Sequence, residues 1–275
     1  MKINCKMIGF FLIAIFTSGC TTARPNGDPT FYSTLWLQTS SEYKATAIQA
    51  YNSAAHNIHN ALHDQSWTSA LEQRQNYSSL PPAIVLDVDE TVLDNSPYQA
   101  QLVLDGAEFD PESWDRWMSM KSALAVPGAV DFINSVSAMG VEVIYITNRE
   151  CKPRSEAGPP CPQETDTIDN LLRIGIKEVE PENMLLKKEK PDWSSEKKSR
   201  REEVASRYRI LMLFGDDLGD FLPDVKKTIT PMQRDDLVNQ FRENWGVKWF
   251  VFSNPVYGSW MGVLSDPKAS YLEGY

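Results

Sequence analysis

The segment AIVLDVDETVL at residues 83–93 combines an uninterrupted apolar run with three carboxylates at its end. Val, Ile and Leu in such a run are typical of a strand that is buried on both faces of a sheet. Asp87, Asp89 and Glu90 come directly after the run. Because an unpaired carboxylate is costly to remove from water, acids in this place indicate a bound cation or a reaction that uses them.

The spacing of Asp87 and Asp89 predicts the kind of chemistry. On an extended strand, side chains two positions apart point to the same side, while Val88 between them points to the other. A few carboxylates, a backbone carbonyl and a phosphate oxygen suit Mg²⁺, which prefers hard oxygen ligands and keeps several waters. Beside a metal-held phosphate, one carboxylate can attack phosphorus while a second carboxylic acid protonates the leaving oxygen.

Three further apolar runs predict more strands: VEVIYIT, ILMLFGD and KWFVFSNP. A helical pattern over residues 35–73 precedes the first predicted strand, and the helix-like segments PGAVDFINSVSAMG and SSEKKSRREEVASRY precede VEVIYIT and ILMLFGD. Strands that alternate with helices favour an open parallel sheet joined by right-handed crossovers.

Polar residues stand where these predicted strands end. They are Asp87 and Asp89 after the first run, Thr147 and Asn148 after the second, and Asp216, Asp217 and Asp220 after the third. In open parallel sheets, ligands bind outside the carboxyl ends of the strands. The sequence therefore predicts that these side chains meet in one site.

Residues 1–20 have the pattern of a secretory signal, with an apolar stretch, MIGFFLIAIF, followed by small residues. Gly19 before Cys20 resembles a bacterial lipobox, in which Cys20 becomes the lipidated N-terminus and anchors the protein to the membrane. Thr17 stands where a lipobox usually has Leu, so an ordinary cleaved signal is the alternative. We therefore predict an exported outer membrane lipoprotein, facing the periplasm or the surface, or else a soluble periplasmic protein. Residues 21–34 are predicted to be a linker.

Because the sequence predicts export, the chemical state of Cys151 and Cys161 can be inferred. They bracket a Pro/Gly-rich segment, KPRSEAGPP. An oxidising compartment favours a disulfide that closes this loop. A zinc site is excluded because two cysteines with no histidine nearby cannot supply a tetrahedral set of ligands.

The formal net charge of the 275 residues is -10, and 42% of them are hydrophobic. The charge argues against binding a nucleic acid polymer. A phosphorylated small molecule is compatible with it if a metal and a few cations are concentrated in one site. The apolar content is enough for a sizeable core.

Several motifs resemble a known family. DVDET, ITN, SEKKSR and GDDLGD look like the four motifs of the haloacid dehalogenase superfamily. The finer pattern is similar to the bacterial class C nonspecific acid phosphatases, which are exported and often lipid-anchored. It comprises LWLQTSSEYKATAIQAYN, DVDETVLDNSPY, VPGAV, TNR, S-x-K-x-x-R, GD-x-L-x-DF and NPVYG, and spans about residues 36–260.

The resemblance implies an α/β fold of the haloacid dehalogenase type. Its open parallel sheet would have flanking helices and a small, mainly helical cap built from the N-terminal region and insertions. The phosphatase domain would occupy residues 35–275, with a core at about 81–260. The cap would receive contributions from about 35–75 and 95–125.

By the same resemblance, Asp87 is the nucleophile and Asp89 the general acid and base. Asp216 would bind Mg²⁺ together with Asp87 and the backbone carbonyl of Asp89, and Asp220 would hold metal-bound waters or Lys197.

The remaining site residues bind the substrate in this interpretation. Thr147 and Asn148 would hydrogen-bond the phosphoryl oxygens, and Lys197, selected by the S-x-K-x-x-R register, would offset their charge. Trp114 and Tyr257 would sandwich the leaving group.

The implied function is a magnesium-dependent acid phosphatase that hydrolyses phosphate monoesters, including nucleoside 5'-monophosphates, through an aspartyl-phosphate. Two alternatives stay open, a phosphotransferase on the same scaffold and a non-catalytic, surface-anchored ligand-binding lipoprotein. A homodimer is a possible assembly.

Overall fold

A computed structural model describes residues 28–275 of the protein. The predicted signal peptide and Cys20 lie outside these residues. Strands alternate with helices along the described chain, as the apolar runs predict. Of the helices in this part of the chain, none has both the length and the apolar content needed to cross a bilayer.

The centre of the fold is a five-stranded sheet with the strand order β5-β4-β1-β6-β7. All of its neighbouring strands pair in parallel. The strands are β1 (Pro82–Leu86), β4 (Glu142–Glu150), β5 (Met184–Lys187), β6 (Arg209–Gly215) and β7 (Trp249–Val251). The predicted open parallel sheet is therefore confirmed. Among the strands of this sheet, β5 alone is absent from the sequence prediction, because its apolar run, MLL, is shorter than the runs of about four to eight residues that indicate a buried strand.

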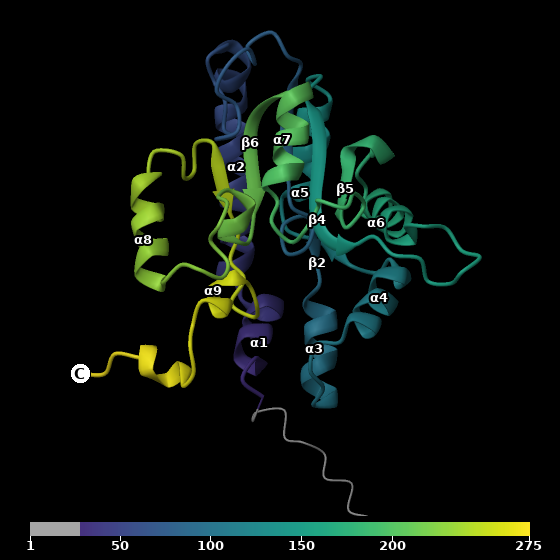
Figure 1. The fold of residues 1–275 in the computed structure, drawn as a ribbon, viewed down its shortest axis with the longest axis vertical. Coiled ribbons are helices and arrows are strands. Elements are labelled where there is room, and N and C mark those ends of the chain that lie inside the picture. Colours follow the sequence, from purple (N-terminus) through teal and green to yellow (C-terminus); the bar gives the residue numbers. More distant parts are fainter. Residues whose placement is uncertain (1–27) are drawn as a thin grey trace, which may run out of the picture.

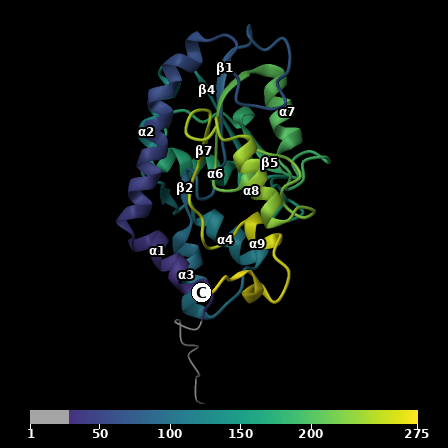
Figure 2. The ribbon, with the colours of Figure 1, turned by 90° about the vertical axis from the view of Figure 1, so that its left-hand side faces the viewer.

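Helices cover both faces of the sheet (Figures 1 and 2). One apolar core forms between the sheet and α2 (Ser41–His63), α5 (Ala129–Ser137) and α6 (Pro162–Arg173). A second core forms on the opposite face, under α7 (Lys198–Arg207) and α8 (Pro231–Gln240). Figure 2 shows α2 along one side of the molecule and α7 and α8 on the other.

The single helix predicted over residues 35–73 is wrong in its boundaries. The chain forms α1 (Phe31–Thr39) and then α2, which ends at His63. The break lies at Ser40, whose backbone is extended and whose side chain accepts a hydrogen bond from the N–H of Tyr43, so it caps α2. Residues 31–34, predicted as linker, belong to α1.

The end of α2 is set by a contact that is remote in sequence. The buried guanidinium of Arg209 donates hydrogen bonds to the backbone carbonyls of Ala61, Leu62 and Asp64. These carbonyls have no partner inside a helix that stops there, and a cation is favourable at a helix C-terminus.

The predicted cap corresponds to an insertion between two short antiparallel strands, β2 (Leu93–Asp94) and β3 (Leu124–Ala125). It consists of α3 (Ser96–Asp105) and α4 (Pro111–Met120), within the predicted range 95–125. α3 packs on α1 and α4 packs on α6. Figure 1 shows α1, α3, α4 and α9 (Ser259–Gly262) together beyond one end of the sheet.

The other predicted cap contribution, residues 35–75, is only partly correct. α1 lies with the cap, whereas α2 packs on the sheet. The reason is the apolar stripe of α2, where buried residues recur every three or four positions, as in Ala47, Tyr51, Ala54 and Ile58.

Candidate active site

The carboxyl ends of β1, β4 and β6 surround a cavity of about 490 Å³. Among the described residues, its lining includes nearly every predicted site residue: Asp87, Asp89, Trp114, Asn148, Lys197, Asp216, Asp220 and Tyr257. Asp217, which the sequence placed at this edge without a role of its own, also lines the cavity, and the lining residues that the sequence did not indicate are Gln99, Phe109, Arg149, Lys226, Gly258 and Ser259. Thr147 is fully buried behind this lining.

Lys197 forms ion pairs with two acids from different strands. It comes from the loop before α7, and only 4% of its surface is exposed. Its Nζ donates to Oδ1 of Asp87 and lies 2.6 Å from Oδ1 of Asp220. Burial opposes the charge on Lys197, but the carboxylates of Asp220 and Asp87 outweigh it and raise its pKa. The charged form of Lys197 is therefore favoured beside Asp87.

Asp87, Asp216 and Asp220 form a cluster in which carboxylate oxygens lie within 4.8 Å of one another. Burial raises the pKa of Asp87 to about 7, against the opposing effect of Lys197. Burial and the carboxylates of Asp87 and Asp220 likewise raise the pKa of Asp216 well above its usual value. Such crowded, desolvated oxygens repel one another and fit a hard divalent cation, which would relieve the repulsion.

The sequence GDDLGD holds Asp220 in place. Asp217 caps a short 3₁₀ helix, Leu218–Asp220, and its own N–H donates to Oδ2 of Asp220 at 3.0 Å. A Cβ at Gly215 would lie only 2.0 Å from the same oxygen. Glycine is therefore needed where the end of β6 passes close to this carboxylate.

Asp216 is oriented from the C-terminal part of the chain. The amide of Asn254, in the NPVYG segment, donates to Oδ2 of Asp216 at 2.7 Å. Ser259 binds Asp217 through its backbone N–H at 2.6 Å and its hydroxyl at 2.8 Å. Asn254 of NPVYG and Ser259 directly after it thus support the acids at the end of β6.

Asp89 lies beyond the end of β1, in an isolated bridge with Leu93 just before a turn, and not on an extended strand, which corrects the sequence expectation. β1 ends at Leu86, and Glu90 adopts a positive φ of 59°. The N–H of Glu90 donates to the carbonyl of Leu93 at 2.8 Å. Asp87 and Asp89 nevertheless reach the same cavity.

Arg149 is the principal partner of Asp89, and sequence reasoning assigned it no role. Its side chain is 1% exposed, and Nη2 lies 2.8 Å from Oδ1 of Asp89. Nη1 donates to Thr167 of α6 at 3.0 Å. One feature of the sequence could have indicated that Arg149 belongs to the site: it directly follows ITN, at the end of an apolar run. Asn95 donates a further hydrogen bond to Asp89 at 2.9 Å.

Thr147 and Asn148 have different surroundings. The hydroxyl of Thr147 donates to Oδ2 of Asp89 at 3.3 Å from behind the cavity wall. Asn148 lines the cavity. Its side-chain oxygen, Oδ1, accepts a hydrogen bond from Nη2 of Arg200 at 2.7 Å, and its side-chain nitrogen, Nδ2, donates to the backbone carbonyl of Ser195 at 3.2 Å. Two residues of the S-x-K-x-x-R segment therefore fix the orientation of Asn148.

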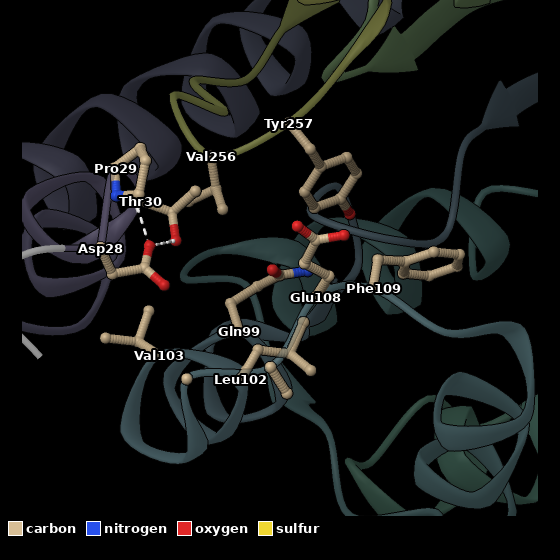
Figure 3. Close-up of a pocket in the computed structure, with 12 residues that line it drawn as sticks. Asp28, Pro29, Thr30, Gln99, Leu102, Val103, Glu108, Phe109, Val256 and Tyr257 are labelled. Atoms are coloured by element: carbon tan, nitrogen blue, oxygen red, sulfur yellow. Dashed lines mark hydrogen bonds between the residues drawn. The ribbon is translucent and has the colours of Figure 1, made fainter. Parts of the chain in front are cut away.

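Aromatic rings form part of the cavity lining. The ring of Trp114 meets Tyr98 edge-on at 5.0 Å and has the guanidinium of Arg149 5.8 Å from its centre. Tyr257 and Phe109 line both the active-site cavity and a neighbouring one of about 710 Å³. Figure 3 shows both rings with Gln99, the third residue shared by the two cavities.

The Cys151–Cys161 pair forms a disulfide with Cα atoms 4.7 Å apart. It joins the segment after β4 to the residue before α6. The bridge thus lies beside Arg149 in sequence, on the side of the cavity where α4 packs on α6.

Comparisons with known proteins agree with this geometry. The family model for the HAD superfamily, subfamily IIIB (acid phosphatase), matches residues 23–260. The class C acid phosphatase from Bacillus anthracis has a TM-score of 0.74 and 32% identity, over 92% of this chain and 100% of that chain. Its structure with tungstate bound has a TM-score of 0.75, with the same identity and coverage.

Two curated plant proteins are more distant. The Stem 31 kDa glycoprotein of Glycine max is 24% identical over 167 residues, or 59% of this chain, and Acid phosphatase 1 of Solanum lycopersicum is 28% identical over 92 residues, or 34%. The matches span 60% and 32% of the length of these two relatives. The family match, however, extends from residue 23 to residue 260 and includes every acid of the site. The chain therefore belongs to subfamily IIIB of the HAD superfamily, the acid phosphatase subfamily.

Proposed function

We propose that this protein is a Mg²⁺-dependent acid phosphatase that hydrolyses phosphate monoesters through an aspartyl-phosphate on Asp87. The observation that carries the proposal is the placement of Asp87, Asp89 and Lys197 around one cavity. The Bacillus anthracis relative with tungstate bound supports it, because tungstate is a tetrahedral oxyanion like phosphate.

In the first chemical step, a carboxylate oxygen of Asp87 attacks phosphorus and the bond from phosphorus to the ester oxygen breaks. Asp89 donates its proton to that oxygen, so the alcohol leaves neutral. In the second step, Asp89 takes a proton from a water molecule that attacks the phosphorus of the aspartyl-phosphate. Inorganic phosphate leaves, and both carboxyl groups return to their starting states.

The surrounding side chains hold the reactants. Lys197 would offset the charge of the phosphoryl oxygens, and the amide of Asn148 would donate to one of them. Arg149 and Asn95 keep the carboxyl of Asp89 in place. Mg²⁺, bound by Asp87, Asp216 and the Asp89 carbonyl with Asp220 in support, would neutralise phosphate charge and help to orient the ester.

Removing divalent metal is expected to stop hydrolysis of para-nitrophenyl phosphate, and Mg²⁺ should restore it. The reason is that a phosphate dianion must enter a site with three clustered carboxylates. Rates are measured after dialysis against EDTA and during Mg²⁺ titration, with phosphate and nitrophenol both quantified. Calorimetry of Mg²⁺ binding to wild type and to Asp216→Asn provides a readout that is independent of turnover, and binding should be weaker in the variant.

Each outcome of this experiment separates the candidates. Undiminished turnover in EDTA would contradict the metal requirement. Nitrophenol released in excess over phosphate, when a sugar alcohol is present, would indicate phosphotransfer. Mg²⁺ binding without any turnover would overturn the enzymatic proposal and favour the ligand-binding alternative.

We also propose that Trp114 and Tyr257 bind the leaving group and favour nucleoside 5'-monophosphates. Both rings line the cavity, and a stacked ring contributes roughly 0.5 to 1.5 kcal/mol beyond its buried area. Trp114→Ala and Tyr257→Ala should therefore lower kcat/KM for nucleoside monophosphates by about two- to tenfold, while glycerol phosphate is hydrolysed almost as before. An equal loss on both substrates would mean that the rings support the fold instead.

Export and lipid attachment through Cys20 remain proposals based on residues 1–20. Cys20→Ser is expected to abolish labelling by a fatty acid probe and to move the protein from the membrane fraction to the soluble periplasmic fraction. Unchanged fractionation of the variant would favour an ordinary cleaved signal.

A further inference from the structure

The loop closed by the Cys151–Cys161 disulfide contains an arginine that bridges the cap and the core. Nε of Arg154 lies 2.7 Å from Oδ2 of Asp115 on cap helix α4. Its Nη1 lies 2.5 Å from Oδ2 of Asp166 on core helix α6. One guanidinium thus joins two helices that come from separate parts of the chain.

Asp115 is held more firmly than an ordinary surface acid. Its side chain is 14% exposed. Besides Nε, Nη2 of Arg154 donates to Oδ1 at 3.1 Å, and the amide of the buried Gln163 donates to the same oxygen at 2.8 Å. Burial opposes the charge of Asp115, but these hydrogen bonds outweigh it and lower its pKa. A two-pronged guanidinium contact of this kind fixes orientation as well as distance.

The position of α4 matters for the site because of its other side chains. Trp114, next to Asp115, lines the active-site cavity. Trp117 has an anchor that does not involve Arg154, because its Nε1 donates to Oδ1 of Asn95 at 2.8 Å, and Asn95 in turn donates to Asp89. Arg154 thus contacts the helix that carries the ring of Trp114. Within residues 28–275, the lining of the active-site cavity and of its neighbour does not include Arg154 itself.

We propose that Arg154 is a positioning residue that fixes α4, and with it the ring of Trp114, over the cavity. It therefore sets the preference for substrates with an aromatic leaving group. This inference rests on the proposed phosphatase function and on Trp114 as a binding ring.

The disulfide has a defined part in this arrangement. It connects the chain after β4 to the start of α6, so both ends of the loop are attached to the core. The middle of the loop is mostly exposed. Closing the loop reduces its conformational freedom, so less entropy is lost when Arg154 pairs with Asp115. Reduction of the disulfide is therefore expected to weaken the same contact.

The test compares Arg154→Gln with Arg116→Gln. Arg116 is an exposed arginine on α4 that makes no ion pair or side-chain hydrogen bond within residues 28–275, so it controls for the loss of charge. In Arg154→Gln, KM for a nucleoside monophosphate should rise about two- to tenfold, because one stacked ring contributes a binding free energy of this size. KM and kcat for glycerol phosphate should stay within about twofold of wild type. Arg116→Gln should match wild type on both substrates.

Two further variants identify the partner and the part played by the bridge. If Arg154 acts through Asp115, the double variant Arg154→Gln/Asp115→Asn should lose no more than the worse single variant. Reduction of wild type, or Cys151→Ser/Cys161→Ser, should reproduce the rise in KM, and reduction should add nothing in Arg154→Gln. Additive losses, or a rise in KM shared equally by glycerol phosphate, would overturn the proposal.

Hydrogen exchange provides a readout that does not depend on turnover. Backbone amides of residues 112–120 should exchange faster in Arg154→Gln and in the reduced protein than in wild type or Arg116→Gln, while those of β1 and β6 are unchanged. Unchanged exchange in α4 would refute the positioning role even if the protein is an active phosphatase. Faster exchange in a protein that hydrolyses no ester would instead count against the proposed function alone.

Discussion

Asp87→Asn is expected to abolish hydrolysis of phosphate esters, with a fall in kcat on the order of 10⁴-fold or more. An amide is nearly isosteric with the carboxylate, so the side chain still fits beside Lys197 and Asp216. It is far too poor a nucleophile to form the bond to phosphorus. The measurement is steady-state kinetics with para-nitrophenyl phosphate. Asp236→Asn, the same change at an exposed residue of α8, is the matched control and should match wild type.

A trapping experiment checks the reason for the loss. Acid-quenched wild type should carry a phosphoryl group on Asp87 during turnover, seen by mass spectrometry as a modified peptide. Asp87→Asn should not carry it, although it should melt near the wild-type temperature and still bind Mg²⁺. Turnover by the variant at a rate close to wild type would contradict the covalent mechanism but not the phosphatase activity.

Lys197→Met is expected to impair both catalysis and stability. The side chain is buried and pairs with Asp87 and Asp220, so its removal leaves two carboxylates without their ammonium. Breaking a buried pair by removing one partner typically costs about 3 to 5 kcal/mol. Loss of a positioned cation at a developing phosphoryl charge should lower kcat by on the order of 10²-fold or more. Thermal melting and kinetics measure the two effects.

Lys198→Met is the control for this change. Lys198 is the next residue, half-exposed, and pairs only with Glu202 one helical turn away among the described residues. Such exposed pairs contribute little, so this variant should stay within about 0.5 kcal/mol of wild type. Added Mg²⁺ should recover part of the stability of Lys197→Met, because a cation among the acids offsets their repulsion. A variant at 197 that melts and turns over like wild type would show that the ammonium has no such role.

The parallel sheet and the location of its site were predictable from sequence because the signals for them are local. An apolar run such as AIVLDV must be buried wherever it lies in the chain, and polar residues directly after it must then stand at the edge of the sheet. The apolar runs that precede Asp87, Thr147 and Asp216 therefore allowed three sides of the cavity to be predicted from the sequence. The Cys151–Cys161 bridge was predictable for a similar reason, since a short segment between two cysteines can be closed locally.

The tertiary structure decided what depends on residues remote in sequence. α2 ends where Arg209 reaches its last carbonyls, and its apolar stripe packs on the sheet and not in the cap. Arg149 was assigned no role because its partner Asp89 lies 60 positions earlier, and no periodicity connects the two. The contact of Arg154 with Asp115 likewise exists only because α4 and α6 pack side by side. A charge on a loop has many possible partners in a sequence, and only the packing of the helices selects one.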